Sequence, residues 1–410
     1  MALNYVWLGF FLIAFVVALF KSVVLHDASI FGEIMNGMFA SAKTGAEISL
    51  GLAGIMTLWL GIMRIGEVAG MINRFSRLVN PFFSKLFPEV PKGHPAMGSM
   101  MMNFSATMLG LDNAATPMGL KAMKELQEIN PKPEEASNPQ IMFLVLNTAG
   151  VVLIPTSVIA IRLAAGAANP ADIFIPTLIS TFMAFIMGMF VVSIYQKINL
   201  FKLPVLVFLT LFAGIMAALY FWVRSLPPAE IGPKTASLGG AIIFGIVIIF
   251  LVAGIVKKIN VYDAFIEGAK EGFQVSVRII PYLVGMLVAI SVFRTTGCLD
   301  YITNGIGLLF AAMGFNTDFV PALPVAFMKP LSGGGARALM VDILKTHGPD
   351  SFVGKLASII QGTTETTFYV LAVYFGSVNI KLTRYALAAG LIADFFGMLC
   401  AILLGYLFFH

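Results

Sequence analysis

Nine apolar stretches are the feature of this sequence that most restricts its fold. Each has about 20 residues, the length that a helix needs to cross roughly 30 Å of hydrocarbon. Only 11% of the 410 residues are charged, whereas soluble domains carry about a quarter. Since helices satisfy their own backbone in lipid, we expect an all-α polytopic membrane protein. The predicted spans are 6–25, 46–65, 140–163, 171–195, 203–223, 237–256, 275–293, 352–375 and 384–408.

Two further segments, Pro95–Leu126 and Phe319–Gly348, are apolar but carry glycines and polar residues in their middle. Two arms of roughly 10 to 12 residues each extend about 15 to 18 Å, half of a bilayer. We predict two re-entrant helical hairpins, with surface loops as the alternative. Residues 67–87 have helical periodicity with a basic face. They predict a helix in the membrane interface or one packed on the protein's own surface.

The second half of the chain repeats the order of elements in the first. Gly45 ends the sequence AKTG and Gly272 ends the sequence AKEG, and an apolar span follows each. Ser105 in the first hairpin and Ser332 in the second each lie 60 positions beyond these glycines. The extra span at 203–223 reverses the second half, so we expect an inverted-topology repeat, as in many secondary transporters.

The domains follow from this repeat: a first repeat over 1–200, a connecting helix and loop over 201–235, and a second repeat over 236–410. Lys and Arg residues are more numerous on one side of the predicted spans. The positive-inside rule then places the N-terminus in the cytoplasm. We expect a multi-pass protein of a bacterial cytoplasmic (inner) membrane.

Both repeats place polar residues where a continuous helix would meet only hydrocarbon. In the second repeat they surround Glu365, and in the first they surround Asn147. A charge at the bilayer centre costs roughly 2.5 to 3.5 kcal/mol. Glu365 should therefore face a water-filled cavity or a partner. Gly362 and Pro155 favour breaks in these helices, which predicts partly unwound transmembrane helices. Threonines that bond only their own backbone are the alternative.

The hairpins supply further polar groups. Gly333 begins a glycine-rich helix start that carries Arg337, where backbone amides favour an anion. Arg337 is expected to bind a carboxylate or phosphate, or to pair with Glu365 or Asp342. Asp112 is interpreted as a helix cap or as a ligand.

Several function classes are disfavoured. No Ser-His-Asp order and no carboxylate pair in a soluble cleft points to an enzyme, and no metal spacing occurs among the four histidines and two cysteines. The basic residues set topology and do not predict nucleic-acid binding.

Two long stretches resemble known families. Residues 103–127, NFSATMLGLDNAATPMGLKAMKELQ, with 143–162, resemble spore maturation protein A. Residues 330–387, which begin PLSGGGARALMVDILKTHG, resemble spore maturation protein B. The chain thus resembles a natural fusion of the two. Both families carry the nucleoside-recognition, or Gate, domain that is also found in concentrative nucleoside transporters and in ferrous-iron transporters.

This resemblance implies that hairpins and unwound helices meet near the midplane and hold a solute and a coupling ion. The chain lacks the extra helices of the nucleoside transporters and the GTPase domain and Cys-lined gate of the iron transporters, so neither substrate is assumed. The spore maturation families are linked to spore core dehydration. The expected binding residues are Asn103, Ser105, Asp112, Asn113, Asn147, Thr148, Ser332, Gly333, Gly334, Arg337, Gln361, Thr363, Thr364 and Glu365.

We therefore expect a secondary transporter of a small polar, anionic or zwitterionic solute. Glu365 would carry a proton or help to bind a cation, with Na⁺ or H⁺ as candidate coupling ions and no cofactor. The rival is a non-transporting membrane scaffold or regulatory component in which Arg337 pairs with Glu365; a channel is a third reading. The expected partners are a small-molecule solute and the lipid bilayer, with a homo-oligomer as an option and no nucleic acid.

Overall fold

The computed structural model describes residues 2–109, 112–153 and 155–410. Within these ranges, the side chains of 2–4, 112–114, 228–229, 231–232 and 278 are left out of the description. The described chain is helical, with connecting loops and one isolated β-bridge between Glu135 and Leu382.

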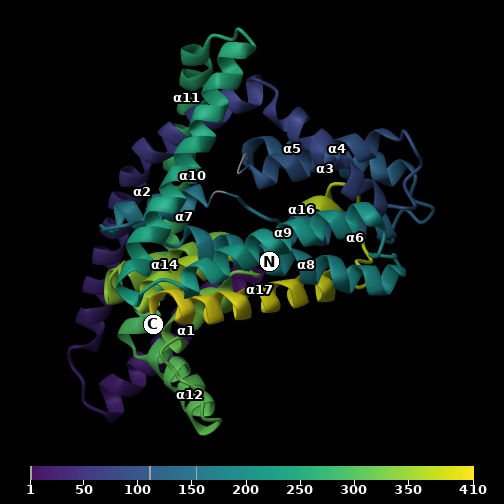
Figure 1. Ribbon diagram of the computed structural model, residues 1–410. Coiled ribbons are helices and arrows are strands. Elements are labelled where there is room, and N and C mark those ends of the chain that lie inside the picture. Colours follow the sequence, from purple (N-terminus) through teal and green to yellow (C-terminus); the bar gives the residue numbers. More distant parts are fainter. Residues whose placement is uncertain (1, 110–111, 154) are drawn as a thin grey trace.

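The helices fall into two series of the same order, separated by α9 (Figure 1). The first series is α1 (Ala2–Val24), α2 (Ile30–Val68), α3 (Met71–Leu86), α4 (Pro95–Met108), α5 (Asp112–Glu128), α6 (Asn138–Thr148), α7 (Thr156–Ala164) and α8 (Phe174–Gln196). The helix α9 (Leu203–Arg224) follows. The second series is α10 (Pro228–Val256), α11 (Val261–Thr295), α12 (Cys298–Ala312), the 3₁₀ turn η1 (Val320–Ala322), α13 (Leu323–Met328), α14 (Gly333–His347), α15 (Phe352–Thr363), α16 (Thr367–Gly376) and α17 (Ala386–Phe409).

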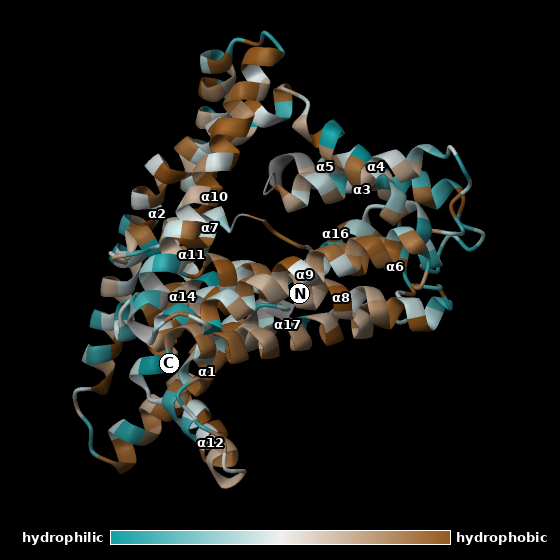
Figure 2. Cartoon of the chain, viewed as in Figure 1, coloured by the Kyte–Doolittle hydropathy of each residue, from teal (hydrophilic) through white to brown (hydrophobic). Residues whose placement is uncertain are grey.

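Among the described residues, seven helices are long and apolar enough to cross a membrane: α1, α2, α8, α9, α10, α11 and α17. In Figure 2 the ribbons of α9 and α17 are coloured mostly as hydrophobic, and many of the connecting loops are coloured as hydrophilic. The other two predicted spans, 140–163 and 352–375, are interrupted, as their polar centres predicted. The chain is an all-α polytopic membrane protein.

The two series are related by a pseudo-two-fold axis where α2 crosses α11. A Cβ added at Gly45 on α2 would lie 3.2 Å from Val284 Cα, and one added at Gly272 on α11 would lie 2.7 Å from Thr57 Cα. The same interval, 227 positions, separates Gly45 from Gly272 and Thr57 from Val284. The close approach of Gly45 to α11 is therefore repeated by that of Gly272 to α2, with the roles of the two helices exchanged.

A second crossing, of α8 with α17, has the same symmetry. Gly188 packs against Ala393, and Gly397 packs against Ala184. In both pairs, equivalent residues lie 209 positions apart. The first helix of each series also packs on the second helix of the other series: α1 contacts α11, and α10 contacts α2. These contacts confirm the inverted repeat, while the exact domain boundaries stay a prediction.

The α2–α11 crossing makes a stability prediction. A Cβ at Gly268 would overlap the carbonyl oxygen of Leu60, so Gly268→Ala is expected to destabilise the protein by about 1–3 kcal/mol. Gly285→Ala on the same helix is the matched control, because nothing lies within 4 Å of its Cβ. It should be neutral or stabilising by up to about 1 kcal/mol, since alanine is the better helix former. The melting temperatures of the two variants are compared by thermal unfolding in detergent, with tryptophan fluorescence as the signal. Equal melting temperatures would contradict the close approach of α2 and α11 at Gly268.

Both predicted hairpins are present. The first consists of α4 and α5, and the second consists of η1 and α13 packed against α14. Their longest arms, α4, α5 and α14, have 14, 17 and 15 residues. These helices are about 21 to 26 Å long, which is less than the roughly 30 Å of a hydrocarbon core. The arms therefore return without crossing.

Two helices are longer than the sequence predicted. The helices α2 and α11 begin well before their apolar spans at 46 and 275, so Lys43 and Lys270 lie within helices and not in loops. No proline precedes the spans to stop either helix.

The amphipathic segment predicted at 67–87 forms α3. Its apolar residues, Ile72, Phe82 and Phe83 among them, are buried against the protein.

Loops of the two series join at both ends of the bundle. At one end Glu134 meets Lys381 at 2.7 Å, and the backbone of 134–136 bonds that of Leu382. At the other end Arg162, which is fully buried, reaches Asp172 at 3.0 Å and donates to Pro349 O at 2.8 Å. The pairing fixes the position of one repeat relative to the other.

Candidate functional site

The two interrupted helices meet each other directly. In the first repeat α6 ends at Thr148 and α7 starts at Thr156; in the second, α15 ends at Thr363 and α16 starts at Thr367. The backbone N–H of Glu365 donates to the carbonyl oxygen of Thr148 at 2.9 Å. The last carbonyls of a helix have no partner within it, so each break supplies a group that the other needs.

Each break is also bonded to the hairpin of its own repeat. The N–H of Leu153 donates to Met108 O at 2.9 Å in the first repeat, and that of Phe368 donates to Pro330 O at 3.0 Å in the second. Two hairpins and two broken helices therefore form one connected centre. Its extended backbone is enclosed by protein, as membrane depth requires.

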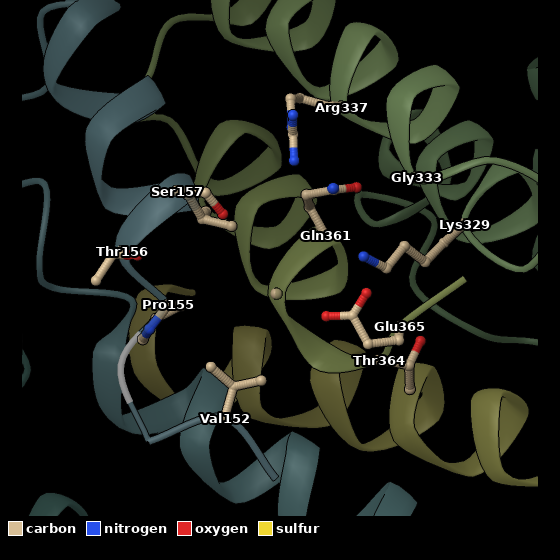
Figure 3. A pocket seen from close by; sticks show the side chains of 12 residues that line it. Val152, Pro155, Thr156, Ser157, Lys329, Gly333, Arg337, Gln361, Thr364 and Glu365 are labelled. Atoms are coloured by element: carbon tan, nitrogen blue, oxygen red, sulfur yellow. The ribbon is translucent and has the colours of Figure 1, made fainter. Parts of the chain in front are cut away.

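A polar cavity of about 120 Å³ opens at this centre (Figure 3). It is bordered by the first break, the second break and the second hairpin. The residues that line it are Val152, Pro155, Thr156, Ser157, Val158, Lys329, Gly333, Arg337, Gln361, Gly362, Thr364 and Glu365.

Among the described residues, the charged side chains that line the cavity are Lys329, Arg337 and Glu365. Lys329 is buried, and Figure 3 shows its ammonium pointing toward the Glu365 carboxylate. Arg337 extends from α14 toward Gln361 in the same view. Gln361 Oε1 is buried and has no hydrogen-bond partner among the described residues. An unsatisfied buried acceptor costs about 1–3 kcal/mol, which a bound molecule or water would recover.

Two helix N-termini add to the positive potential. Gly333 at the start of α14 and Thr156 at the start of α7 both line the cavity. The start of α14 is fixed by Ser332, whose Oγ accepts from Gly335 N–H at 3.0 Å. Free amides and the helix dipole favour an anionic group at such positions. The arrangement suits a small solute with a carboxylate or phosphate group.

The family assignment now follows from comparison with known proteins. A family model named Gate and described as nucleoside recognition matches residues 49–223 and 276–381. The match covers more than half of the chain, and it includes the hairpin and the interrupted helix of each repeat. The chain belongs to the Gate family.

Curated relatives of this Gate protein match its sequence in parts. It is 47% identical over 159 residues to spore maturation protein B of Bacillus subtilis (strain 168), which is 39% of this chain and 88% of that relative. It is 40% identical over 178 residues to spore maturation protein A of the same organism, 43% of this chain and 87% of that relative. The resemblance seen in the sequence is confirmed. No solved structure matches.

The Gate fold brings five of the predicted residues to the cavity: Gly333, Arg337, Gln361, Thr364 and Glu365. Ser332 serves as the cap of α14, and Gly334 follows it outside the cavity lining. Thr363 donates to Ile359 O at 2.7 Å, so it bonds its own helix as the alternative reading held.

Four predicted residues of the first repeat, Asn103, Ser105, Asn147 and Thr148, are not among the residues that line the cavity. Asn147 donates to Phe143 O at 2.8 Å within α6. Asn103 is buried and donates to Ala115 O at 2.8 Å and to the Tyr374 hydroxyl at 3.3 Å. Ser105 and Thr148 are fully buried as well. Asp112 and Asn113 have side chains that fall outside the described part of the structure.

Asp342, one of the partners predicted for Arg337, forms an ion pair with Arg294 of α11. The helix α14 packs against α11, and Asp342 is not among the residues that line the cavity. A pairing of Arg337 with Asp342 stays a prediction.

Sequence reasoning missed two charged residues, Lys329 and Asp394. Lys329 lies in the apolar first arm of the second hairpin, and Asp394 is the one charged residue of α17. Asp394 is 1% exposed and accepts from Thr367 Oγ1 at 2.5 Å. The signal was the same one that identified Glu365, a charge inside an apolar span.

Among the described residues, the four charged side chains at this centre, Lys329, Arg337, Glu365 and Asp394, come from the second repeat. The helix ends show which residues of the first repeat correspond to them. Lys329 directly follows α13 and corresponds to Leu109, which directly follows α4, and Arg337 is the fifth residue of α14 and corresponds to Thr116, the fifth residue of α5. The N-caps Ser137 and Ser351 pair Glu365 with Val151, and Gly188 and Gly397 pair Asp394 with Phe185. None of these four counterparts is charged.

A larger hollow of about 770 Å³ lies between α12, the second hairpin and α17. Its lining is apolar, with Phe310, Leu323 and Phe395 as examples, and Asp394 is the one charged residue among the lining side chains. Such a surface on membrane helices fits acyl chains, and it does not fit a polar solute.

Proposed function

We propose that this Gate-family protein is a secondary transporter of a small anionic or zwitterionic solute, which binds in the cavity between the broken helices and the second hairpin. The observation that carries the proposal is the buried Lys329 facing Glu365 in a cavity enclosed at the meeting of both breaks. Buried charges are maintained where they act on a substrate or an ion path.

The charges support a solute with a negative end. Within the described ranges, Lys329 and Arg337 supply two cations to the cavity wall, Gly333 and Thr156 supply helix N-termini, and Glu365 supplies one carboxylate. A carboxylate or phosphate group would bind between the cations. Glu365 would accept the ammonium of a zwitterion, or the proton or coupling cation that the sequence analysis assigned to it.

The size of the cavity narrows the solute class. The cavity of about 120 Å³ is small and polar, and it favours a compact solute such as phosphate, a short carboxylate or a small amino acid. We therefore propose a solute smaller than a nucleoside, and the description of the family does not by itself give the solute of this chain.

The breaks give the site a means of movement. The backbone bond between Glu365 and Thr148 links the two repeats, and the bonds to Met108 and Pro330 link each break to its hairpin. A rocking of one repeat against the other would stretch these bonds, together with the contacts that join the repeats at the two ends of the bundle, and would leave the helices intact. That is the usual alternating-access motion of inverted repeats.

We also propose that the protein resides in a bacterial cytoplasmic membrane with its N-terminus inside. The excess of basic residues on one side supports this orientation. We further propose that it is not an enzyme.

Uptake into proteoliposomes tests the function. The full-length protein is reconstituted and supplied with labelled phosphate, succinate, glycine, glycylglycine or uridine. We expect saturable uptake of at least one of the first four and none of uridine. Folded protein that takes up no member of the panel would favour the scaffold, and conductance without saturation would favour a channel.

The variant Glu365→Gln refines the role of that carboxylate. It is expected to lower uptake of a zwitterion by about tenfold or more, because a charge-assisted bond contributes about 1.5–3 kcal/mol, and to flatten the pH dependence of uptake. Uptake of a simple anion should fall less. The measurement is initial uptake rate between pH 5.5 and 8. Unchanged rates and an unchanged pH profile would remove Glu365 from the mechanism.

A further inference from the structure

The Asp394 carboxylate on α17 lies deep in the protein, yet the cavity does not use it. Its Oδ2 accepts from Thr367 Oγ1 at 2.5 Å, and its Oδ1 is buried without a hydrogen-bond partner among the described residues. An ionised carboxylate has about four acceptor positions. On its far side lies the apolar hollow, which offers no water-like solvation. A bare charge there would be costly.

Threonines of both breaks surround this carboxylate. Gly390 and Gly397 flank Asp394 on one face of α17. A Cβ at Gly390 would lie 2.8 Å from Thr367 Cγ2 and 3.5 Å from Thr148 Cγ2. A Cβ at Gly397 would lie 2.9 Å from Thr363 Cγ2 and 3.4 Å from Thr364 Cγ2. The glycines thus allow the breaks to approach on either side of Asp394.

The hydroxyl of Thr148 repeats the feature found at Asp394. Thr148 is fully buried, and its Oγ1 also lacks a hydrogen-bond partner within the described ranges. Thr364 Oγ1, on the second break, is a third such oxygen beside Asp394 Oδ1 and Thr148 Oγ1. Buried polar atoms without a hydrogen-bond partner are uncommon in folded proteins, and a cation bound between the two breaks would satisfy these oxygens.

The surrounding electrostatics favour a cation. The C-terminal ends of α6 and α15, at Thr148 and Thr363, converge here, and helix C-termini carry partial negative charge. The charged groups that act on Asp394 are Lys329 and Glu365, of opposite sign. The packed helices α6 and α8 contribute no charged side chain, and Lys355 of α15 is bound to Asp172.

The donor types restrict which cation fits. One carboxylate with threonine hydroxyls gives only oxygen ligands, and no group of three or more His, Cys, Asp or Glu residues gathers anywhere in the described ranges. Transition metals select nitrogen and sulfur ligands, while oxygen donors with a single charge suit an alkali ion or a proton.

We infer that Asp394, Thr148, Thr364 and Thr367 form a binding site for a monovalent cation, Na⁺ or H⁺, that neutralises the carboxylate. Thr364 also lines the solute cavity, so the two sites share a wall. The cation site depends only on its own geometry; its role as the coupling site rests on the proposed function.

Thermal unfolding of the full-length protein without any solute tests the site. Na⁺ replaces choline at constant ionic strength and pH 8, and in a second series the pH falls from 8 to 5 in choline alone. If Na⁺ is the ligand, the melting temperature rises by several degrees as Na⁺ is added and then reaches a plateau. If the proton is the ligand, the melting temperature rises as the pH falls in the choline series. Asp394→Asn should abolish whichever response occurs. Equal responses of wild type and variant in both series overturn the inference.

A second variant keeps the test decisive if Asp394→Asn does not fold. Thr148→Val keeps the volume and removes the hydroxyl, so it should shift the Na⁺ midpoint about tenfold or the pH midpoint by about one unit. Thr181→Val is the control, because Thr181 is also fully buried but donates to Leu178 O. A Thr148→Val midpoint equal to that of the control also overturns the inference. Since no solute is present, a failed uptake experiment leaves this result unaffected.

Discussion

Lys329→Met is expected to reduce solute uptake by about 10- to 100-fold while the protein stays folded. Lys329 is 5% exposed, and its ammonium points into the cavity toward Glu365. Loss of a charge-assisted contact to the solute costs about 1.5–3 kcal/mol, which corresponds to this factor. Methionine is unbranched like lysine and uncharged, so the substitution removes the ammonium and keeps most of the side-chain volume.

The measurement is the concentration dependence of initial uptake in proteoliposomes, with the solute found in the panel. Lys124→Met is the matched control, since Lys124 is exposed on the first hairpin. If Lys329→Met and Lys124→Met transport alike, the solute does not bind in this cavity and the proposed function fails.

Arg162→Met is expected to cause the largest loss of stability, about 3–5 kcal/mol. Its side chain is fully buried and donates to Pro170 O at 3.2 Å and Pro349 O at 2.8 Å, and it lies 3.0 Å from Asp172. Methionine fills similar space but leaves two carbonyls unsatisfied and deprives a buried carboxylate of one of its partners. The contact with Pro349 also joins the two repeats.

Unfolding by heat in detergent and by limited proteolysis would measure this loss. Arg77→Met on α3 serves as control, because Arg77 is exposed and surface substitutions usually change stability by less than about 0.5 kcal/mol. A loss for Arg162→Met no larger than for Arg77→Met would show that the buried network does not hold the repeats together.

The course of the chain through the membrane could be predicted from the sequence because its signals are local. Length and apolarity identified the continuous spans, and glycines flanked by polar residues located both hairpins. The interruption at 364–366 was predicted from Gly362 and Glu365, and α15 ends there at Thr363. Each of these follows from residues within one or two helical turns.

The composition of the site could be predicted only in part, since it depends on contacts between distant segments. Lys329 and Glu365 come together because α13 and α15 pack on each other. Asp394 gains its surroundings from Thr148, which lies in the other repeat. Asn103, which stays a predicted ligand, donates its amide N–H to the hydroxyl of Tyr374 on α16, a contact that its spacing in sequence does not indicate, while its Oδ1 has no hydrogen-bond partner among the described residues.

The unequal halves have an energetic consequence. In a transporter built from two inverted copies, the inward-open and outward-open shapes arise when the copies exchange conformations. Here an exchange would move the backbone of Leu109 and Val151 into the places of Lys329 and Glu365 without moving these two charges. Under the proposed function, the two end states then have unequal free energy, and the empty protein is expected to rest facing one side of the membrane until a bound solute or ion compensates the difference.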